Sequence, residues 1–295
     1  MEDLIRKALA NSVEVSKNSK IEKILPVGGG CIHKAWCVHF QNGKKVFAKS
    51  NHIDNINMFK FERECLLALK RFANESYIHI PKPIALISYQ NISLLVLEWI
   101  DLIHSQQNLL GKGLGLLHKS STEEKNKCFG WAEEGYIGSN NQIKGWDSDW
   151  GKFFVNYRLR PQLIRAAKWG VKVEDYEDSL GFLSSYLNNH HPRVSLVHGD
   201  LWSGNCGSSQ KGLGTIYDPA SYWGDREVDI AMTKLFGGFN IEFYKGYEAI
   251  WPLDNLSKDR TEIYNLYHLL NHANIFGGSY KENSLEILKN LRSRY

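Results

Sequence analysis

Asp200 and Asn205 lie five residues apart in one short segment, 198–205, and Asp218 follows in an Asp-Pro pair. Transfer of a γ-phosphoryl group needs a hydroxyl oriented for in-line attack and divalent cations that bridge the phosphates. Asp200 can accept the proton of the hydroxyl, and the side-chain oxygens of Asn205 and Asp218 suit Mg²⁺. A simple turn needs no such combination, so the spacing predicts a kinase with a metal site.

The segments on either side of this loop have the composition of short strands. Residues 194–197 and 215–217 are rich in β-branched and other apolar side chains. We therefore expect a strand, loop, strand hairpin that carries Asp200, Asn205 and Asp218. We also expect Asp200 to keep the ordinary pKa of an aspartate, so that it mainly orients the hydroxyl and takes its proton late.

A kinase also needs a lysine on a strand that follows a glycine-rich turn. Gly29 and Gly30 belong to such a turn, and residues 35–40 and 45–49 read as a hairpin that ends in Lys49. Glycine allows backbone amides to approach phosphate oxygens closely, because no side chain stands in the way. The pattern predicts a phosphate-binding loop with Lys49 as the phosphate clamp.

The lysine in turn needs a carboxylate that holds it toward the phosphates. Apolar residues over 58–72 recur with the period of an amphipathic helix. This helix can present either Glu62 or Glu64 to Lys49, and we favour Glu62. The alternative is that both glutamates are ordinary solvated helix residues.

The chain changes character near residue 98. We expect a short helix at 4–9, a strand-rich segment at 13–47, the helix at 58–72, strands at 81–99, and mainly helices beyond. The 295 residues suit two lobes better than one core. We predict an α+β architecture with a β-rich N-lobe at 1–97, a hinge at 98–102 and a mostly helical C-lobe at 103–295. Backbone groups of Glu98 and Ile100 would then hold adenine.

Composition indicates a soluble cytoplasmic protein. Hydrophobic residues make up 43% of the chain and charged residues 23%, and the net charge of +4 is spread without a basic stripe. We expect no nucleic-acid partner, no membrane insertion and no secretion. An odd number of cysteines without a C-x-x-C pair argues against a disulfide framework or a zinc site; they are Cys31, Cys37, Cys65, Cys128 and Cys206.

Two further patterns resemble sites but have simpler explanations. Gly111, Gly113 and Gly115 alternate like a nucleotide-binding run, yet no strand precedes them, which favours helix packing. His268 and His272 have the spacing of a helical metal site but lack the glutamate of the H-E-x-x-H motif. A packed histidine pair is the favoured interpretation.

Longer runs resemble the fructosamine kinases, also called ketosamine kinases, which share the protein-kinase-like fold with the aminoglycoside and choline kinases. The resemblance covers nearly the whole chain. It rests on residues 198–205, 217–232 and 235–239, and on shorter segments at 129–130, 135–138, 153–154, 158–163 and 264–280.

The resemblance implies ATP and Mg²⁺ as cofactors and phosphorylation of the C3 hydroxyl of a ribulosamine, erythrulosamine or fructosamine. The acceptor would be an adduct of a lysine or a small amine, and its 3-phosphate would break down, which makes the reaction a deglycation. The family pattern implies the roles inferred above: Gly29 and Gly30 for the phosphate loop, Lys49 with Glu62, Asp200 as the catalytic residue, and Asn205 and Asp218 as metal ligands.

Other residues near the site have roles that come from the resemblance or from the chemistry of their side chains. Asp229 would brace the catalytic loop through backbone hydrogen bonds, and Arg226 belongs to the same brace or has another partner. Trp202 either offers a flat wall to the sugar or packs in the core. Residues 140–145 depart from the family pattern and add Lys144, so acceptor preference differs. Cys31 is expected to be a redox switch that links two subunits, or an inert thiol in a monomer.

Two rival functions remain at this point. An aminoglycoside or choline kinase shares the lysine, aspartate and asparagine arrangement, but its cationic acceptors call for an acidic cleft in the C-lobe that the sequence does not identify. A catalytically inactive nucleotide-binding regulator shares the fold but has no need of Lys49, Asp200, Asn205 and Asp218 together.

Overall fold

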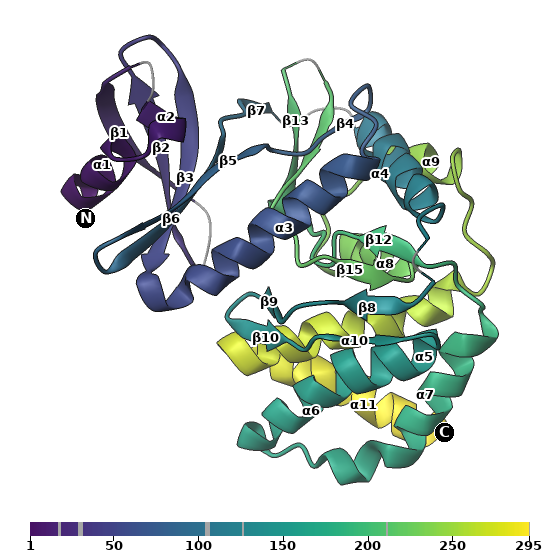
Figure 1. Ribbon diagram of the computed structural model, residues 1–295. Helices are drawn as coiled ribbons and strands as arrows, with labels where there is room; N and C mark the ends of the chain where they lie inside the picture. Colours follow the sequence, from purple (N-terminus) through teal and green to yellow (C-terminus); the bar gives the residue numbers. More distant parts are fainter. Residues whose placement is uncertain (17–18, 29–31, 104–106, 126, 211, 295) are drawn as a thin grey trace.

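The computed structural model describes residues 1–16, 19–28, 32–103, 107–125, 127–210 and 212–294. A β-sheet region near the N-terminus lies beside a larger region that is mostly helical (Figure 1). The α+β architecture with a β-rich N-lobe and a helical C-lobe, expected from the sequence, is confirmed. Among the described residues, no helix combines the length and the apolar character needed to cross a membrane.

The sheet of the N-lobe is antiparallel and has the order β1-β2-β3-β6-β5. Its strands are β1 (Ile21–Val27), β2 (Lys34–Phe40), β3 (Lys45–His52), β5 (Pro83–Tyr89) and β6 (Ile92–Glu98). β2 and β3 form the predicted hairpin, and Gly43 in its turn has a φ of +81° that suits glycine. Side chains alternate across a strand, so Val46 and Ala48 face one side of the sheet and Lys49 the other.

Helices cover both faces of this sheet. α1 (Glu2–Ala10) and α2 (Val13–Ser16) pack on the face of Val46, and α3 (Ile56–Phe72) follows the 3-10 turn η1 (Ile53–Asn55) and packs on the other. The prediction of a strand-rich segment from residue 13 was wrong at its start, where α2 lies. Val15 is buried with the apolar residues of α1, and a helix of one turn is too short to show a helical period.

The C-lobe consists mainly of helices joined by short connections. They are α4 (Gln107–Ser121), α5 (Trp150–Phe153), the π-helix η2 (Phe154–Leu159), α6 (Arg160–Ala166), the 3-10 turns η3 (Ala167–Trp169) and η4 (Val173–Tyr176), α7 (Glu177–Asn189), α8 (Glu227–Leu235), α9 (Ile241–Glu248), α10 (Ser257–Phe276) and α11 (Ser279–Arg294). In α4, a Cβ atom added to Gly111 would lie 2.0 Å from the carbonyl oxygen of Phe243 in α9. The glycine run therefore serves helix packing, as the sequence favoured.

Short strands carry the loops between these helices. One sheet has the order β11-β8-β15-β12, a second β4-β14-β13-β7, and β9 pairs with β10. Their bounds are β4 (Ile78–His79), β7 (Leu102–Ile103), β8 (Phe129–Trp131), β9 (Gly135–Ile137), β10 (Asn140–Gln142), β11 (Gly145–Asp147), β12 (Ser195–Val197), β13 (Cys206–Ser209), β14 (Gly214–Ile216) and β15 (Tyr222–Gly224). β4 precedes the expected hinge, yet it pairs with a strand of the C-lobe.

The predicted strand, loop, strand hairpin is wrong in its pairing. β12 pairs with β15, whereas β14 pairs with β13. The loop that carries Asp200 therefore passes from one sheet to another. The sequence did not indicate β13, because its residues Cys-Gly-Ser-Ser lack the β-branched side chains that mark a strand.

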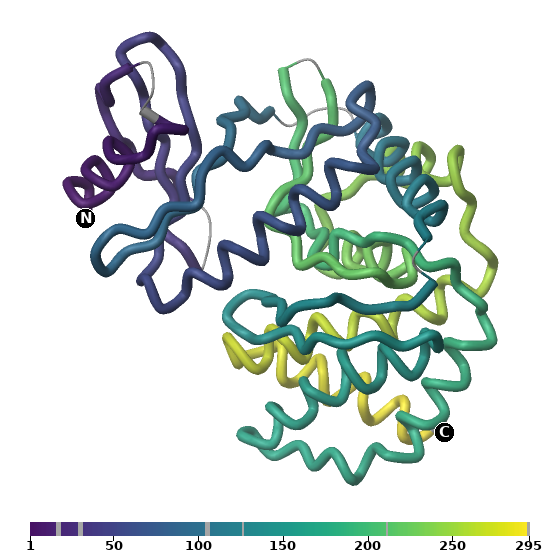
Figure 2. The backbone as a smooth tube through the Cα atoms, viewed as in Figure 1, coloured from purple at the N-terminus to yellow at the C-terminus, as the bar shows by residue number. Residues whose placement is uncertain are grey.

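α3 belongs to the cores of both lobes. Phe59 and Leu66 pack in a cluster with Leu95 and Leu97 of the N-lobe sheet, whereas Phe61 lies in the large core cluster of the C-lobe. Figure 2 shows α3 extending from the N-lobe toward the C-lobe. This helix is therefore the main rigid connection between the two regions.

Candidate active site

Three residues singled out from the sequence meet between the lobes. The ammonium nitrogen of Lys49 on β3 lies 2.7 Å from a carboxylate oxygen of Glu62 on α3, and both side chains are buried. Lys49 also forms an ion pair with Asp218, which follows β14. Charge-assisted hydrogen bonds of this kind are strong where water is excluded. The structure thus places the favoured glutamate, and not the exposed Glu64, beside the lysine.

The position of Glu62 is fixed by its neighbour Phe61, a residue that the sequence did not single out. The Phe61 ring is buried and meets the rings of Trp131 and Tyr136 edge to face, with centroids 6.4 Å and 6.2 Å away. Gly135 allows this contact, since an added Cβ would lie 2.7 Å from the ring. Strands β8 and β9 of the C-lobe therefore hold α3 and its glutamate in place. Local sequence contains no signal for such a contact, because it joins segments far apart in the chain.

Asp200 and Asn205 come together as the spacing predicted. The side-chain nitrogen of Asn205, in the 3-10 turn η5 (Ser203–Asn205), lies 2.9 Å from the Asp200 carbonyl oxygen and 3.1 Å from its carboxylate. The same nitrogen is 3.5 Å from the carbonyl oxygen of Asp218. These contacts engage the amide nitrogen of Asn205, and its amide oxygen is the atom of this side chain that can bind a cation.

Asp229 of α8 braces the catalytic loop through hydrogen bonds to its backbone amides, as the resemblance implied. Its buried carboxylate accepts hydrogen bonds from the backbone amides of His198 at 2.7 Å and Gly199 at 2.8 Å. The ring of His118 on α4 lies 3.1 Å from the same carboxylate. Burial alone would raise the pKa of Asp229, but the bond and charge of His118 and the loop contacts hold it below the usual value. No motif in the sequence indicated this role for His118, because its helix lies far from Asp229 in the chain.

The glycine and histidine of the loop have structural reasons of their own. Gly199 has a φ of +82°, and a Cβ there would lie 2.2 Å from the carbonyl oxygen of Ala220. Burial lowers the pKa of His198 to about 4, so its ring is neutral at pH 7. One ring nitrogen lies 3.0 Å from the Tyr217 carbonyl oxygen, and the other accepts from the Asp200 amide at 3.3 Å. The ring therefore ties the catalytic loop to the segment of Asp218.

The expectation of an ordinary pKa for Asp200 was wrong. Burial raises the pKa of Asp200 to about 7, the Asn205 hydrogen bond opposes this change, and the charge of Asp229 adds to it. Spacing along the chain could not reveal the degree of burial. A carboxylate with a pKa near 7 is a better proton acceptor than an exposed aspartate.

Asp218 adopts an unusual backbone conformation, with a φ of +57° that non-glycine residues rarely have. This conformation directs its carboxylate toward Lys49. The side chain is 38% exposed, so solvent reaches it. The Asp218 carboxylate and the Asn205 amide oxygen are hard oxygen donors, and their chemistry fits the preference of Mg²⁺.

The glycine-rich loop and the cysteine beside it lie outside the described residues. This concerns Gly29, Gly30 and Cys31, and the structure describes Gly28 on one side of them. Among the cysteines that the structure describes, Cys37, Cys65, Cys128 and Cys206 are not disulfide-bonded.

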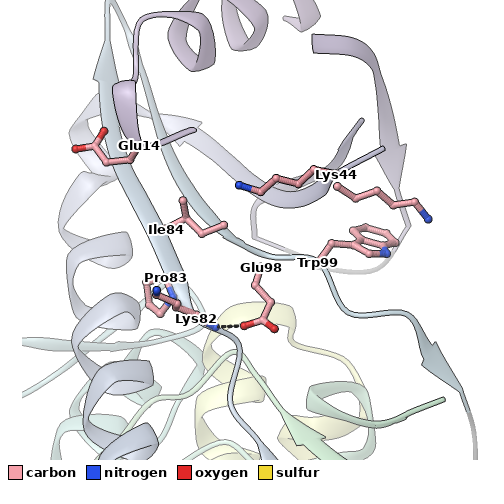
Figure 3. Close-up of a pocket in the computed structure, with 8 residues that line it drawn as sticks. Glu14, Lys44, Lys82, Pro83, Ile84, Glu98 and Trp99 are labelled. Carbon is pink, nitrogen blue, oxygen red and sulfur yellow. Dashed lines mark hydrogen bonds between the residues drawn. The ribbon is translucent and has the colours of Figure 1, made fainter. Parts of the chain in front are cut away.

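The expected hinge follows β6 directly. The Glu98 carboxylate accepts a hydrogen bond from the Lys82 amide at 2.9 Å and lies 3.0 Å from the ring of His79. It borders a hollow of about 620 Å³ lined by Glu14, Lys44, Lys45, Lys82, Pro83, Ile84, Glu98 and Trp99 (Figure 3). Side chains alternate along β6, so Glu98 faces away from the side of Lys49. The Glu98 side chain is therefore not placed to contact a nucleotide on the Lys49 side, and the adenine contacts expected from the backbone of Glu98 and Ile100 stay a prediction.

Trp202 lies at the surface of the loop and is not a core residue. Its side chain is 37% exposed, and its ring lies over Gly204, where an added Cβ would lie 2.2 Å from a ring carbon. Gly204 therefore allows the indole to lie flat on the loop two residues after Asp200. This placement leaves the indole accessible to an acceptor.

The segment 140–145 packs beside the loop that follows Asp218. Gln142 donates a hydrogen bond to the Ala220 carbonyl oxygen at 3.1 Å and accepts one from the Tyr267 hydroxyl at 3.0 Å. Asn140 donates to Asn271 at 2.9 Å. Lys144, the charge that departs from the family pattern, is exposed.

Three other residues singled out from the sequence, Arg226, His268 and His272, make contacts away from the proposed phosphoryl-transfer residues. Arg226 donates to the carbonyl oxygens of Trp251 and Pro252 at 2.6 Å and 2.7 Å, and its guanidinium lies 4.0 Å from the Trp251 ring centroid. It therefore anchors the segment before α10. Arg226 also donates to the Tyr247 hydroxyl at 3.2 Å, and this hydroxyl lies 2.9 Å from the ring of His118, which contacts Asp229, so Arg226 is connected to the Asp229 brace through these two side chains. His268 and His272 form a packed pair, since a ring nitrogen of His272 lies 2.8 Å from the His268 carbonyl oxygen.

Comparison with known proteins agrees with this geometry. A probable ketoamine kinase of Synechocystis sp. is 37% identical over 273 residues, which cover 92% of this chain and 90% of the relative. A chloroplastic protein-ribulosamine 3-kinase of Oryza sativa subsp. indica is 32% identical over 288 residues, which cover 92% of this chain and 79% of the relative. Similarity thus extends over both lobes.

Solved structures give the same result for the fold. The crystal structure of a proposed fructosamine-3-kinase from Haemophilus somnus has a TM-score of 0.85 and 26% identity, and the match covers 99% of this chain and 97% of that one. Small-molecule kinases at 14% identity share the protein-kinase-like fold alone. A family model for fructosamine kinase matches residues 2–294. The chain therefore belongs to the fructosamine kinase family and is a phosphotransferase with a hydroxyl acceptor.

Proposed function

We propose that this enzyme transfers the γ-phosphoryl group of ATP to the C3 hydroxyl of a ketosamine, the rearranged adduct of a sugar with an amine. The observation that carries the proposal is the Asp200 carboxylate, which accepts a hydrogen bond from the Asn205 amide and whose pKa burial raises to about 7. The names of the ketoamine and ribulosamine kinase relatives support a ketosamine as the acceptor.

Each residue of the site has a defined part in this reaction. Asp200 orients the C3 hydroxyl and takes its proton as the oxygen attacks phosphorus. Lys49, held by Glu62, binds phosphate oxygens. The amide oxygen of Asn205 and the carboxylate of Asp218 would hold Mg²⁺, which neutralises charge on the phosphates.

The N-lobe residues complete the proposed nucleotide site. Gly29 and Gly30 would provide backbone amides to the phosphates, and the backbone of Glu98 and Ile100 would hold adenine within a hinge at residues 98–102. A disulfide between two subunits through Cys31 stays a prediction from the sequence.

The product chemistry explains why this acceptor is useful. Phosphate on C3 is a good leaving group beside an enolisable C2 ketone, so elimination expels inorganic phosphate without an enzyme. Hydrolysis of the resulting imine then releases the amine. The proposed outcome is removal of the sugar from a protein lysine or a small amine.

The direct test is MgATP-dependent turnover of ribulose-lysine and fructose-lysine adducts. We expect the wild type to phosphorylate at least one adduct at O3, located by NMR, and Asp200→Asn to lose about a thousandfold in turnover. Turnover of choline or an aminoglycoside with no ketosamine turnover would replace this proposal with one of the rival kinase functions. ATP binding with no acceptor at all would favour the regulatory function.

A further inference from the structure

Five aromatic rings form a continuous surface that begins at the catalytic loop. We call Trp202, Phe236, His272, Phe276 and Tyr280 the aromatic shelf. The Trp202 ring meets Phe236 edge to face at 6.3 Å, and Phe236 contacts His272 at 4.9 Å and Tyr280 at 6.2 Å between centroids. Phe276 extends the surface through His272 at 5.7 Å and Tyr280 at 6.4 Å. None of these rings has a part in phosphoryl transfer.

The shelf is joined rigidly to the catalytic loop. Phe236 directly follows α8, and Gly238, two residues later, packs so closely on Ser203 that an added Cβ would lie 2.4 Å from the Ser203 Cβ. Gly238 also accepts a hydrogen bond from Gln107 of α4 at 2.8 Å. The start of the shelf therefore moves together with Asp200.

The far end of the shelf is open to solvent. Phe276 is 50% exposed, whereas the other end, Trp202, is 37% exposed. Exposed aromatic rings that continue directly from a catalytic loop offer a surface to a ligand. Two exposed rings are common on a protein surface, but five rings linked by successive contacts form an extended surface.

The ring faces of the shelf can attract a cationic ligand, although the Lys281 ammonium lies near the far end, 3.9 Å from the position of a Cβ added to Gly277. Burial lowers the pKa of His272, so its imidazole is neutral at pH 7 and does not repel a cation. Lys281, next to Tyr280, directs its ammonium over the Trp169 ring, 5.7 Å from the centroid. The faces of the phenyl, phenol and indole rings carry the negative quadrupole that attracts ammonium groups.

We propose that the aromatic shelf binds the amine side of the acceptor, namely a protonated secondary amine and the alkyl or aryl chain attached to it. The inference rests on the proposed function, because the sugar hydroxyl at Asp200 determines where the amine must lie. In a ketosamine only two carbon atoms separate C3 from the nitrogen, so the nitrogen lies close to Trp202. The chain attached to it then extends toward Phe276.

The test varies the amine while the sugar is constant. We would measure kcat/KM for ribulose adducts of methylamine, butylamine and benzylamine with the wild type, Phe276→Ala and Phe276→Leu. We expect the wild type to favour the benzylamine adduct, and Phe276→Ala to lower the benzylamine to methylamine ratio about tenfold through lost ring and apolar contact. Phe276→Leu should preserve most of the butylamine preference, because leucine restores apolar area but no ring.

Leu256→Ala is the matched control. Leu256 is 57% exposed, comparable to Phe276, but it precedes the 20-residue helix α10 at the opposite end, about 30 Å away. It should leave the ratio unchanged. An unchanged ratio in Phe276→Ala, or the same change in Leu256→Ala, would overturn the proposal.

Binding separates failure of this inference from failure of the proposed function. Calorimetric titration of the same adducts with the enzyme and MgADP needs no turnover. Tighter binding of the benzylamine adduct that Phe276→Ala abolishes supports the shelf even if the wild type phosphorylates none of the adducts. Equal affinity of the wild type for all adducts would overturn the proposal that the shelf binds the amine, whatever the turnover.

Discussion

Replacement of Phe61 by alanine should impair the proposed nucleotide site, although Phe61 is not one of the residues proposed to bind the nucleotide. The Phe61 ring lies among Gly135, Tyr136 and Trp131 of the C-lobe and fixes the turn of α3 that carries Glu62. Without the ring, β8 and β9 no longer hold this turn. Glu62 then loses its fixed distance of 2.7 Å to Lys49.

The structure indicates how large the loss of stability and the loss of activity should be. The ring is 4% exposed, so its removal should cost about 3 kcal/mol of unfolding free energy, through lost burial and the cavity left behind. A hydrogen bond between charged groups contributes about 1.5–3 kcal/mol. If Phe61 acts only through Glu62, the loss in kcat/KM for ATP should be about tenfold to a hundredfold.

The assay is a double-mutant cycle of Phe61→Ala and Glu62→Gln, read as kcat/KM for ATP and as MgATP affinity at a temperature where all variants are folded. We expect strong non-additivity: Phe61→Ala should cost little in the Glu62→Gln background, because the contact it supports is already gone. Phe61→Leu should restore part of the activity. Leu67→Ala, at an exposed position of the same helix, should be neutral.

Equal costs of Phe61→Ala in both backgrounds would refute this reasoning, because the ring would then act on catalysis by a route other than Glu62. A loss in kcat/KM from Leu67→Ala as large as that from Phe61→Ala would also refute it. In that case general destabilisation of α3 would explain both losses.

Two further outcomes follow from the buried ionisable groups. Asp229→Asn should lower kcat about a hundredfold with a smaller change in the KM for ATP, because the amides of His198 and Gly199 lose their acceptor and the catalytic loop shifts; an unchanged kcat would contradict the brace. Burial alone would lower the pKa of His190, but the hydrogen bond and charge of Asp225 raise it above its usual value of 6.5. The stability that His190 contributes is thus complete below pH 6.5 and lost as the pH rises through the raised pKa. Urea unfolding measures this contribution as the difference in unfolding free energy between wild type and His190→Gln. The difference should become smaller as the pH rises, and a difference that becomes larger would contradict this assignment.

The catalytic loop could be predicted from the sequence because its chemistry is local. Asp200 and Asn205 lie within one short segment, so their spacing alone places the proposed proton acceptor beside a proposed cation ligand. Lys49 and Glu62 could be predicted almost as well, since strand and helix periods determine which side chains share a face. The protein-kinase-like fold followed from these elements together with the resemblance.

Contacts between distant segments could not be predicted. Asp229 meets His118 across 111 residues of chain, and no period or motif connects those positions. The raised pKa of Asp200 has the same origin, because burial depends on what the rest of the chain packs around the loop. The short strand β13 escaped prediction for a different reason, since its pairing with β14 compensates for residues of low strand propensity.

The proposed phosphoryl-transfer residues and the proposed aromatic shelf differ in how strongly their members depend on one another. The phosphoryl-transfer residues are coupled: Lys49 contacts Glu62 and Asp218, and Asn205 contacts Asp200, so a change in one disturbs the next. The proposed shelf meets the catalytic loop at its start, through Trp202 and through Gly238 beside Phe236, whereas its exposed end at Phe276 has no contact with that loop among the ring pairs of the described residues. Substitutions at that end can therefore change which amine is accepted while the chemistry stays intact. This independence predicts that acceptor preference is determined by α10 and α11, and the acceptor series on Phe276 variants measures it directly.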